Sequence, residues 1–243
     1  MYLGLVLLAA GYPLLAQGRL DSRARAGYFV AGLLTLWAGL ETPIDTLSDC
    51  CLQSVHMGQH VLLGIVAPPL LVLGLSPAMA RSLVRRLPPL RAVTEPVPGQ
   101  LLAALVMIAW HLPPLYDLTV WEPVHIFEHL TFIAAGVCFW WPVVGSTGEQ
   151  ARWRLGDGGR IVYLLIGTLP QDGVALPLIF SRAPFYAFYE HAPRLVEALT
   201  PIVDQNLAGS LLMFAGKTSY LLALLVVFAR WVSRDRREGA ISA

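Results

Sequence analysis

Long apolar stretches dominate this 243-residue chain and restrict it to one class of fold. A helix needs roughly 20 apolar residues to cross about 30 Å of hydrocarbon, and the first and fourth stretches reach that length only with flanking residues. The sequence predicts an all-α, polytopic membrane protein with seven transmembrane helices in a single domain, residues 1–243. The stretches fall at residues 1–17, 26–42, 51–75, 100–113, 125–145, 160–181 and 206–231.

The composition supports this class of protein. The chain is 56% hydrophobic and 14% charged, whereas a soluble domain carries about 25% charged residues. The first stretch lacks the positive start and the cleavage site of a signal peptide, so we interpret it as a true helix. No part of the sequence resembles a nucleic-acid-binding surface, and clustered arginines are explained by topology and by contact with lipid.

Basic residues in the loops predict the orientation. Fourteen of the 17 lysines and arginines fall in alternate loops and after the last stretch, and such residues stay on the cytoplasmic side. The N-terminus is therefore expected outside and the C-terminus inside. The residues are Arg19, Arg23, Arg25, Arg81, Arg85, Arg86, Arg91, Arg152, Arg154, Arg160, Arg230, Arg234, Arg236 and Arg237.

Two His-x-x-x-His pairs lie in the apolar stretches, His56-Met-Gly-Gln-His60 and His125-Ile-Phe-Glu-His129. Residues four apart share one helix face, so each pair can present two imidazoles to one ion. One such pair in a soluble helix is usually structural. Inside membrane helices ionisable groups are costly, and two pairs at matching depth favour a metal or haem site.

The predicted orientation places the histidines on one side of the membrane. At 1.5 Å per residue, His56 and His60 lie roughly 7 and 13 Å below the outer surface, and His129 roughly 6 Å below it. His111 ends the fourth stretch on the same side, either as a ligand or bonded to a carbonyl. The sequence predicts one metal site with nearby carboxylates, formed by His56, His60, His111, His125, His129, Asp45 and Asp204.

Sulfur atoms bear on the identity of the metal. Met57 and Met107 lie near the histidines, and thioether with imidazole suits Cu(I), whereas histidine with carboxylate suits zinc. Methionine in an apolar helix is more often packing. Three cysteines make no disulfide framework, and the vicinal Cys50 and Cys51 are either structural or a thiol site where metal arrives.

Two further charges are expected near the middle of the membrane. Asp172 and Lys217 form either a mutual ion pair or part of a proton or ion pathway. Prolines at positions 68 and 69 predict a break in the third helix that opens room between helices.

Six short motifs, spread from the first outer loop to the seventh stretch, together resemble the seven-helix CtaG family of cytochrome c oxidase assembly proteins. The resemblance covers most of the chain. The motifs are Thr42-Pro-Ile-Asp45, His56-Met-Gly-Gln-His-Val-Leu-Leu63, Ala67-Pro-Pro-Leu70, His125-Ile-Phe-Glu-His129, Phe139-Trp-Trp-Pro142 and Asp204-Gln-Asn-Leu-Ala-Gly209.

This resemblance implies a non-enzymatic protein of the bacterial plasma membrane that helps a haem–copper oxidase to mature. Its expected cofactor is copper, and its expected partners are an oxidase subunit and the lipid bilayer. The sequence is also compatible with a homo-oligomer. The family pattern marks Asp45, His56, His60, His125, His129 and Asp204.

Two alternatives remain open at the level of sequence. His125-x-x-Glu128-His129 matches an inverted zincin pattern, in which two histidines hold zinc and the glutamate is the base. An intramembrane zinc hydrolase would use these residues. A haem-binding electron-transfer protein would instead clamp haem across helices, between His60 and His129 or between His56 and His125.

Overall fold

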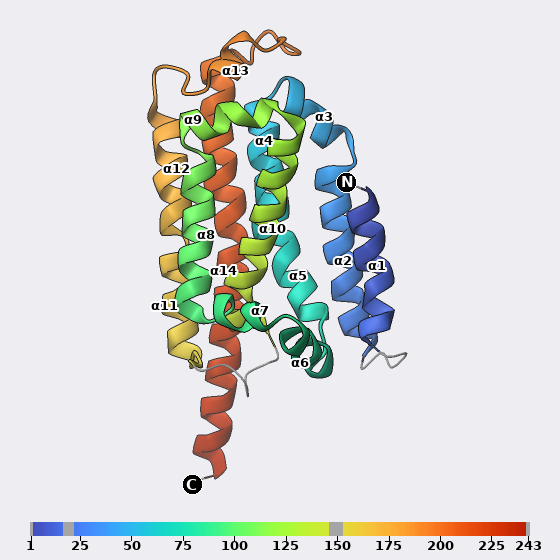
Figure 1. Cartoon of the computed structure of the whole chain (residues 1–243). Helices are drawn as coiled ribbons and strands as arrows, with labels where there is room; N and C mark the ends of the chain where they lie inside the picture. Colours follow the sequence, from blue (N-terminus) through green and yellow to red (C-terminus); the bar gives the residue numbers. More distant parts are fainter. Residues whose placement is uncertain (1, 17–21, 146–152, 242–243) are drawn as a thin grey trace.

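The computed structural model of this chain describes residues 2–16, 22–145 and 153–241. These residues are folded as helices joined by short connections, with no β-strand among them. Most of the long helices run alongside one another in a bundle, and α14 projects from one end of it (Figure 1). The prediction of an all-α fold is confirmed.

Each of the seven apolar stretches contains a helix or a run of helices. Two stretches are interrupted, and in each of them the second helix has proline in its first turn, at positions 68 and 170. In chain order the elements are α1 (Tyr2–Leu15), α2 (Arg23–Leu40), α4 (Gln53–His60) with η1 (Val61–Val66) and α5 (Ala67–Gly74), α8 (Pro96–Trp110), α10 (Glu122–Val144), α11 (Asp157–Gly167) with α12 (Leu169–Phe180), and α14 (Pro201–Ile241).

Four helical stretches of the described chain are long and apolar enough to cross a membrane. They are Gln53–Gly74, Glu122–Val144, Asp157–Phe180 and Pro201–Arg237. A fifth span is made if α8 is joined to the segment Pro113–Val120, from which it is bent by 77°. The chain is therefore a multi-pass membrane protein, whereas the arrangement of seven spans remains a prediction.

Short helices cover the two ends of the bundle (Figure 1). One end carries α3 (Pro43–Cys50), α9 (Pro113–Tyr116), and α13 (Ala187–His191). The other end carries α6 (Pro77–Arg86), α7 (Pro88–Val93), and the projecting part of α14.

The arginines that predict orientation are concentrated in the segments at this second end, the arginine-rich end. They lie in α6, in α7, and in the last turns of α14. Arg19 and Arg152 lie outside the described residues. Which end faces the cytoplasm remains a prediction from the positive-inside rule.

The third apolar stretch changes its helical geometry where a break was predicted. The π-helical segment η1 precedes Pro68 and Pro69 at the start of α5. A proline lacks the N–H of a regular helix and its ring crowds the carbonyl four residues earlier, so the wider turns relieve both problems. The carbonyl of Gly64 in η1 lies so close to Gly136 of α10 that a Cβ atom there would clash with it. The two helices that carry the histidine pairs therefore pack closely.

Two other predictions are resolved in the same bundle. Lys217 Nζ of α14 lies 2.8 Å from Asp172 Oδ1 of α12, so the expected ion pair is confirmed. Cys50 and Cys51 form a vicinal disulfide, and Cys138 is free and buried. Of the two alternatives left open for this pair, the disulfide favours the structural one, because a disulfide sulfur is not a thiolate ligand.

Candidate metal centre

Four buried side chains from two helices converge on one point. His56 and His60 come from α4, and Glu128 and His129 come from α10. One ligand atom from each of the four lies within 4.8 Å of those of the others. The two histidine pairs, which are separate in the sequence, therefore meet in space.

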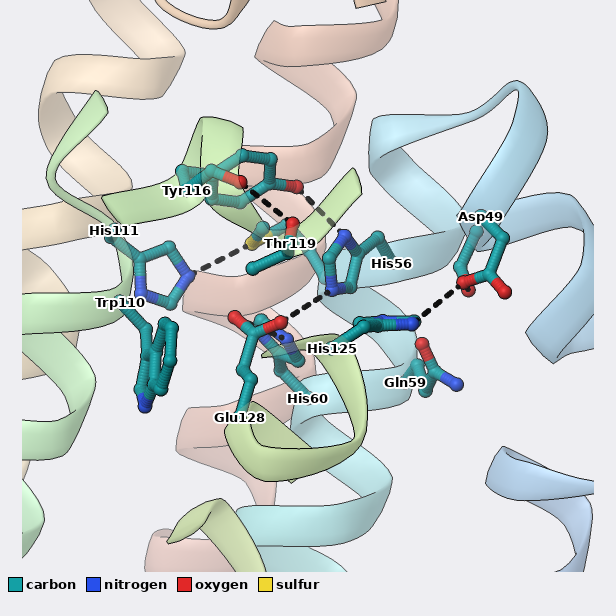
Figure 2. A network of polar contacts seen from close by, with 12 residues as sticks. Asp49, His56, Gln59, His60, Trp110, His111, Tyr116, Thr119, His125 and Glu128 are labelled. Carbon is teal, nitrogen blue, oxygen red and sulfur yellow. Dashed lines mark hydrogen bonds and ion pairs between the residues drawn. The ribbon is translucent and has the colours of Figure 1, made fainter. Parts of the chain in front are cut away.

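Glu128 lies between the imidazoles of α4. Its Oε2 is 3.6 Å from His56 Nε2, and its Oε1 is 3.4 Å from His60 Nε2. The glutamate is 0% exposed. Figure 2 shows its carboxylate directed toward both rings. A buried carboxylate is stable only when it is paired with positive charge or with several hydrogen-bond donors.

Several polar atoms of this cluster have no hydrogen-bond partner. They are His56 Nε2, both nitrogens of His60, His129 Nε2 and both carboxylate oxygens of Glu128. Unsatisfied buried polar atoms are rare in proteins, and each one calls for a partner. A bound cation would satisfy the converging nitrogens and oxygens together, so these residues fit a metal ion.

Two tyrosines orient His56 from the side opposite Glu128. His56 Nδ1 lies 2.8 Å from the hydroxyl of Tyr116 and 3.0 Å from that of Tyr189. The Tyr189 hydroxyl donates to the carbonyl of Ser48 at 2.9 Å. When Nδ1–H of His56 donates to these hydroxyls, Nε2 keeps its lone pair for a metal, as in known histidine sites.

His125 lies beside the four-residue cluster, toward the end of the bundle that carries α3. Its ring centroid is 4.0 Å from that of His129 and 5.1 Å from that of His56. Its Nδ1 is 2.9 Å from Asp49 Oδ1, and its Nε2 is buried without a hydrogen-bond partner. A small cavity of about 90 Å³ reaches this point and is lined by Asp49, His56 and His125.

His111 terminates α8, and of the two roles that the sequence left open the structure shows the bond to a carbonyl. Its Nδ1–H donates to the carbonyl of Met107 at 2.6 Å. Its Nε2, which then carries the lone pair, lies 3.2 Å from Met57 Sδ. The ring centroid is 5.3 Å from that of His60. Met57 thus places a thioether beside a free imidazole nitrogen, whereas Met107 contributes a backbone carbonyl.

The two predicted carboxylates, Asp45 and Asp204, lie outside the four-residue cluster. Asp204 accepts hydrogen bonds from the backbone N–H groups of Gln53 at 2.6 Å and Ser54 at 3.3 Å, so it caps the start of α4. Asp45 accepts a hydrogen bond from Gln59 Nε2 at 2.8 Å. Burial, and next the charge of Asp49, raise the pKa of Asp45 above its usual value.

Sequence reasoning missed several residues of the site. Glu128 was considered only as the base of a hydrolase, although its spacing of three residues from His125 already places it on the same helix face as that histidine. The carboxylate that contacts an imidazole of the site from α3 is Asp49, which the sequence did not single out, rather than Asp45. No sequence signal indicated Tyr116 and Tyr189, because their contacts with His56 join segments far apart in the chain.

Comparisons with known proteins find sequence relatives and one protein family. Curated relatives include uncharacterized proteins of Mycobacterium bovis and Mycobacterium tuberculosis, each 27% identical over 265 residues, and one of Mycobacterium leprae, 24% identical over 274 residues. These alignments cover 96% of this chain and 38% of each relative, so the chain spans well under half the length of these proteins.

No solved structure matches the chain. The model of one protein family, described as the cytochrome c oxidase caa3 assembly factor, matches residues 5–234, which is nearly the whole sequence. This match agrees with the resemblance carried by the six sequence motifs. The chain belongs to the CtaG family of cytochrome c oxidase caa3 assembly factors.

Proposed function

We propose that this protein binds copper inside the bacterial plasma membrane and delivers it to a subunit of a haem–copper oxidase during assembly. His56, His60, Glu128 and His129 would hold the ion. The observation that carries the proposal is the convergence of these four buried residues within 4.8 Å, with unpartnered nitrogens and oxygens. The activity is binding and transfer rather than catalysis, as befits a family of assembly factors.

The choice of copper over zinc depends on Met57 and His111. Imidazole and carboxylate ligands accept either metal, whereas a thioether favours Cu(I). Met57 Sδ and His111 Nε2 are 3.2 Å apart, and the His111 ring is adjacent to that of His60. An ion leaving or reaching the four-residue cluster therefore has a soft pair of donors beside it.

The route of the ion would start at the end of the bundle that carries α3. Asp49 is exposed there and contacts His125, whose Nε2 is unpartnered. His125 is in turn next to His129 and His56. A cation would first meet the carboxylate of Asp49, pass to His125, and then enter the buried cluster.

The geometry gives the two other functions less support. The cavity beside His56 and His125 is about 90 Å³, far smaller than a haem needs. In a hydrolase the glutamate would face a water on the metal, but both oxygens of Glu128 face the imidazoles of α4. We therefore do not propose a haem protein or a zinc hydrolase.

Elemental analysis of the purified full chain tests the proposal. We expect about one copper per chain in the wild type, and its loss in His60→Ala and His129→Ala. His191→Ala is the matched control, because His191 lies in α13 outside the cluster. Oxidase assembly in cells should fail in the same two variants. A metal-free wild-type protein that still supports assembly would overturn the proposal.

A further inference from the structure

A second cavity, of about 340 Å³, lies away from the histidine cluster. It is lined by residues of α2, η1 with α5, α10, the start of α11, and α14. Along α14 it extends from Ser219 to Arg234, which is roughly 22 Å at 1.5 Å per residue. That length exceeds the depth of one leaflet, about half of a 30 Å hydrocarbon core, so the cavity can hold an acyl chain together with a polar headgroup.

The wall of this cavity is apolar over most of its length and open on one side. Pro69 and Leu70, which belong to a family motif that the metal centre does not use, form part of it. Tyr28 is 45% exposed, Leu222 is 59% exposed and Val226 is 49% exposed along its margin. In a membrane these residues face hydrocarbon, so a lipid chain has lateral access to the cavity.

Two buried donors in the wall lack acceptors. Trp140 is 1% exposed, and its indole Nε1 has no hydrogen-bond partner. Arg160 Nε is buried and unpartnered as well. Trp140 lies one turn before the end of α10 at Val144, close to the arginine-rich end. Each donor calls for an oxygen acceptor that the described protein does not supply.

The polar end of the cavity is positively charged. Arg160 and Arg234 share one carboxylate, that of Asp157, and Arg160 Nη1 lies 3.6 Å from it. Arg230 also lines the cavity and has no ion pair within the described part of the chain. Three guanidinium groups against one carboxylate leave an excess of positive charge where a lipid headgroup would lie.

We infer that this cavity binds one anionic phospholipid. Its phosphate would lie against Arg160 and Arg230, an ester carbonyl would accept from Trp140 Nε1, and one acyl chain would follow α14. Basic pockets between transmembrane helices at the cytoplasmic surface are suited to anionic headgroups. An acyl chain fits the apolar wall, and ester and phosphate oxygens provide the acceptors that the two donors lack.

Native mass spectrometry of the full chain tests this inference. The protein is reconstituted with equal amounts of dioleoyl phosphatidylglycerol and dioleoyl phosphatidylcholine, and each retained lipid is identified from the mass that it adds to the protein. We expect one retained phosphatidylglycerol. Arg230→Gln should reduce its retention about fivefold, the effect of removing one basic contact near the surface. Arg237→Gln is the control: it removes the same charge two turns along α14, outside the cavity.

Trp140→Phe keeps an aromatic ring and removes the N–H. Retention of phosphatidylglycerol should fall while retention of phosphatidylcholine does not change. The smaller ring beside Tyr220 should lower the unfolding temperature in phosphatidylcholine alone without preventing folding. Equal retention of the two lipids would overturn the inference. An equal loss in Arg237→Gln, or a quinone recovered in place of the phospholipid, would do the same.

Discussion

Glu128 places a fully buried carboxyl group at a depth where a charge is not expected without a partner. Both of its oxygens lie within 3.6 Å of imidazole nitrogens and form no hydrogen bond. Glu128→Gln keeps the shape and removes the charge. We expect metal affinity to fall by about 10–100-fold. Because a buried charge is lost, the metal-free protein should unfold at the same temperature or a higher one.

Metal titration and thermal unfolding with a chelator measure these two effects of Glu128→Gln. Glu190→Gln on α13 is the control, because this glutamate is exposed and outside the cluster. If both variants bind metal as tightly as the wild type, Glu128 is not part of the binding site.

Asp49 and Asp45 lie one turn apart on α3 but have different partners. Asp49 contacts His125 Nδ1 at 2.9 Å, whereas Asp45 contacts Gln59. Asp49→Asn should weaken metal binding about 10-fold or more, since it removes the carboxylate that orients an imidazole. Asp45→Asn should have the smaller effect on metal affinity. Isothermal titration of both variants with metal measures the two affinities, and the reverse order would favour Asp45 over Asp49 as the carboxylate of the site.

Asp45 also predicts a pH dependence of stability. Its pKa in the folded protein is raised by burial and by Asp49. The contribution of Asp45 to the free energy of unfolding is therefore fully present below the pKa of about 3.9 that it has in the unfolded chain. This contribution is lost as pH rises through its pKa in the folded protein. Asparagine keeps the acceptor for Gln59 without the charge. In the presence of a metal chelator, the Asp45→Asn protein should have a higher free energy of unfolding than the wild type at pH 7. This difference in stability should vanish near pH 3.5. An advantage that does not change with pH would exclude titration of Asp45 as its cause.

At the residue scale the sequence predicted the histidines better than their partners. The four-residue spacing fixes which imidazoles share a helix face, and the structure brings His56, His60 and His129 together. The roles of Asp204, which caps α4, and of Asp49, which contacts His125 of α10, depend on tertiary contacts between segments far apart in the chain. Asp204 caps α4 across a separation of 150 residues from Ser54, a contact that no local pattern encodes.

At the scale of elements, apolar stretches located the helices and prolines located their irregularities. The sequence did not specify that the third stretch contains a π-helical segment or that its Gly64 meets Gly136. Such close approaches depend on the pairing of helices, because small residues are needed only where two backbones come into contact.

Gly136→Ala tests this contact. A Cβ atom at position 136 would lie 2.6 Å from Pro68 Cγ and also against the carbonyl of Gly64, which cannot move without shifting η1. We expect the free energy of unfolding to fall by about 1–3 kcal/mol. Metal binding should fall too, because α10 carries Glu128 and His129. Gly173→Ala on α12 is the control, since nothing lies within 4 Å of its added Cβ atom. A fully stable Gly136→Ala protein would show that the helices are farther apart.

At the scale of the whole molecule, the arginines predict which end of the bundle faces the cytoplasm. Alkaline phosphatase, which is active only outside the plasma membrane, distinguishes the two ends. Inserted after Pro193, beyond α13, it should be active; fused after Arg237 in α14, it should be inactive. The reversed pattern would place the end carrying Asp49 and His125 in the cytoplasm. It would leave the four-residue cluster intact but require copper to arrive from inside, which would overturn the proposed route of delivery while sparing the proposed site.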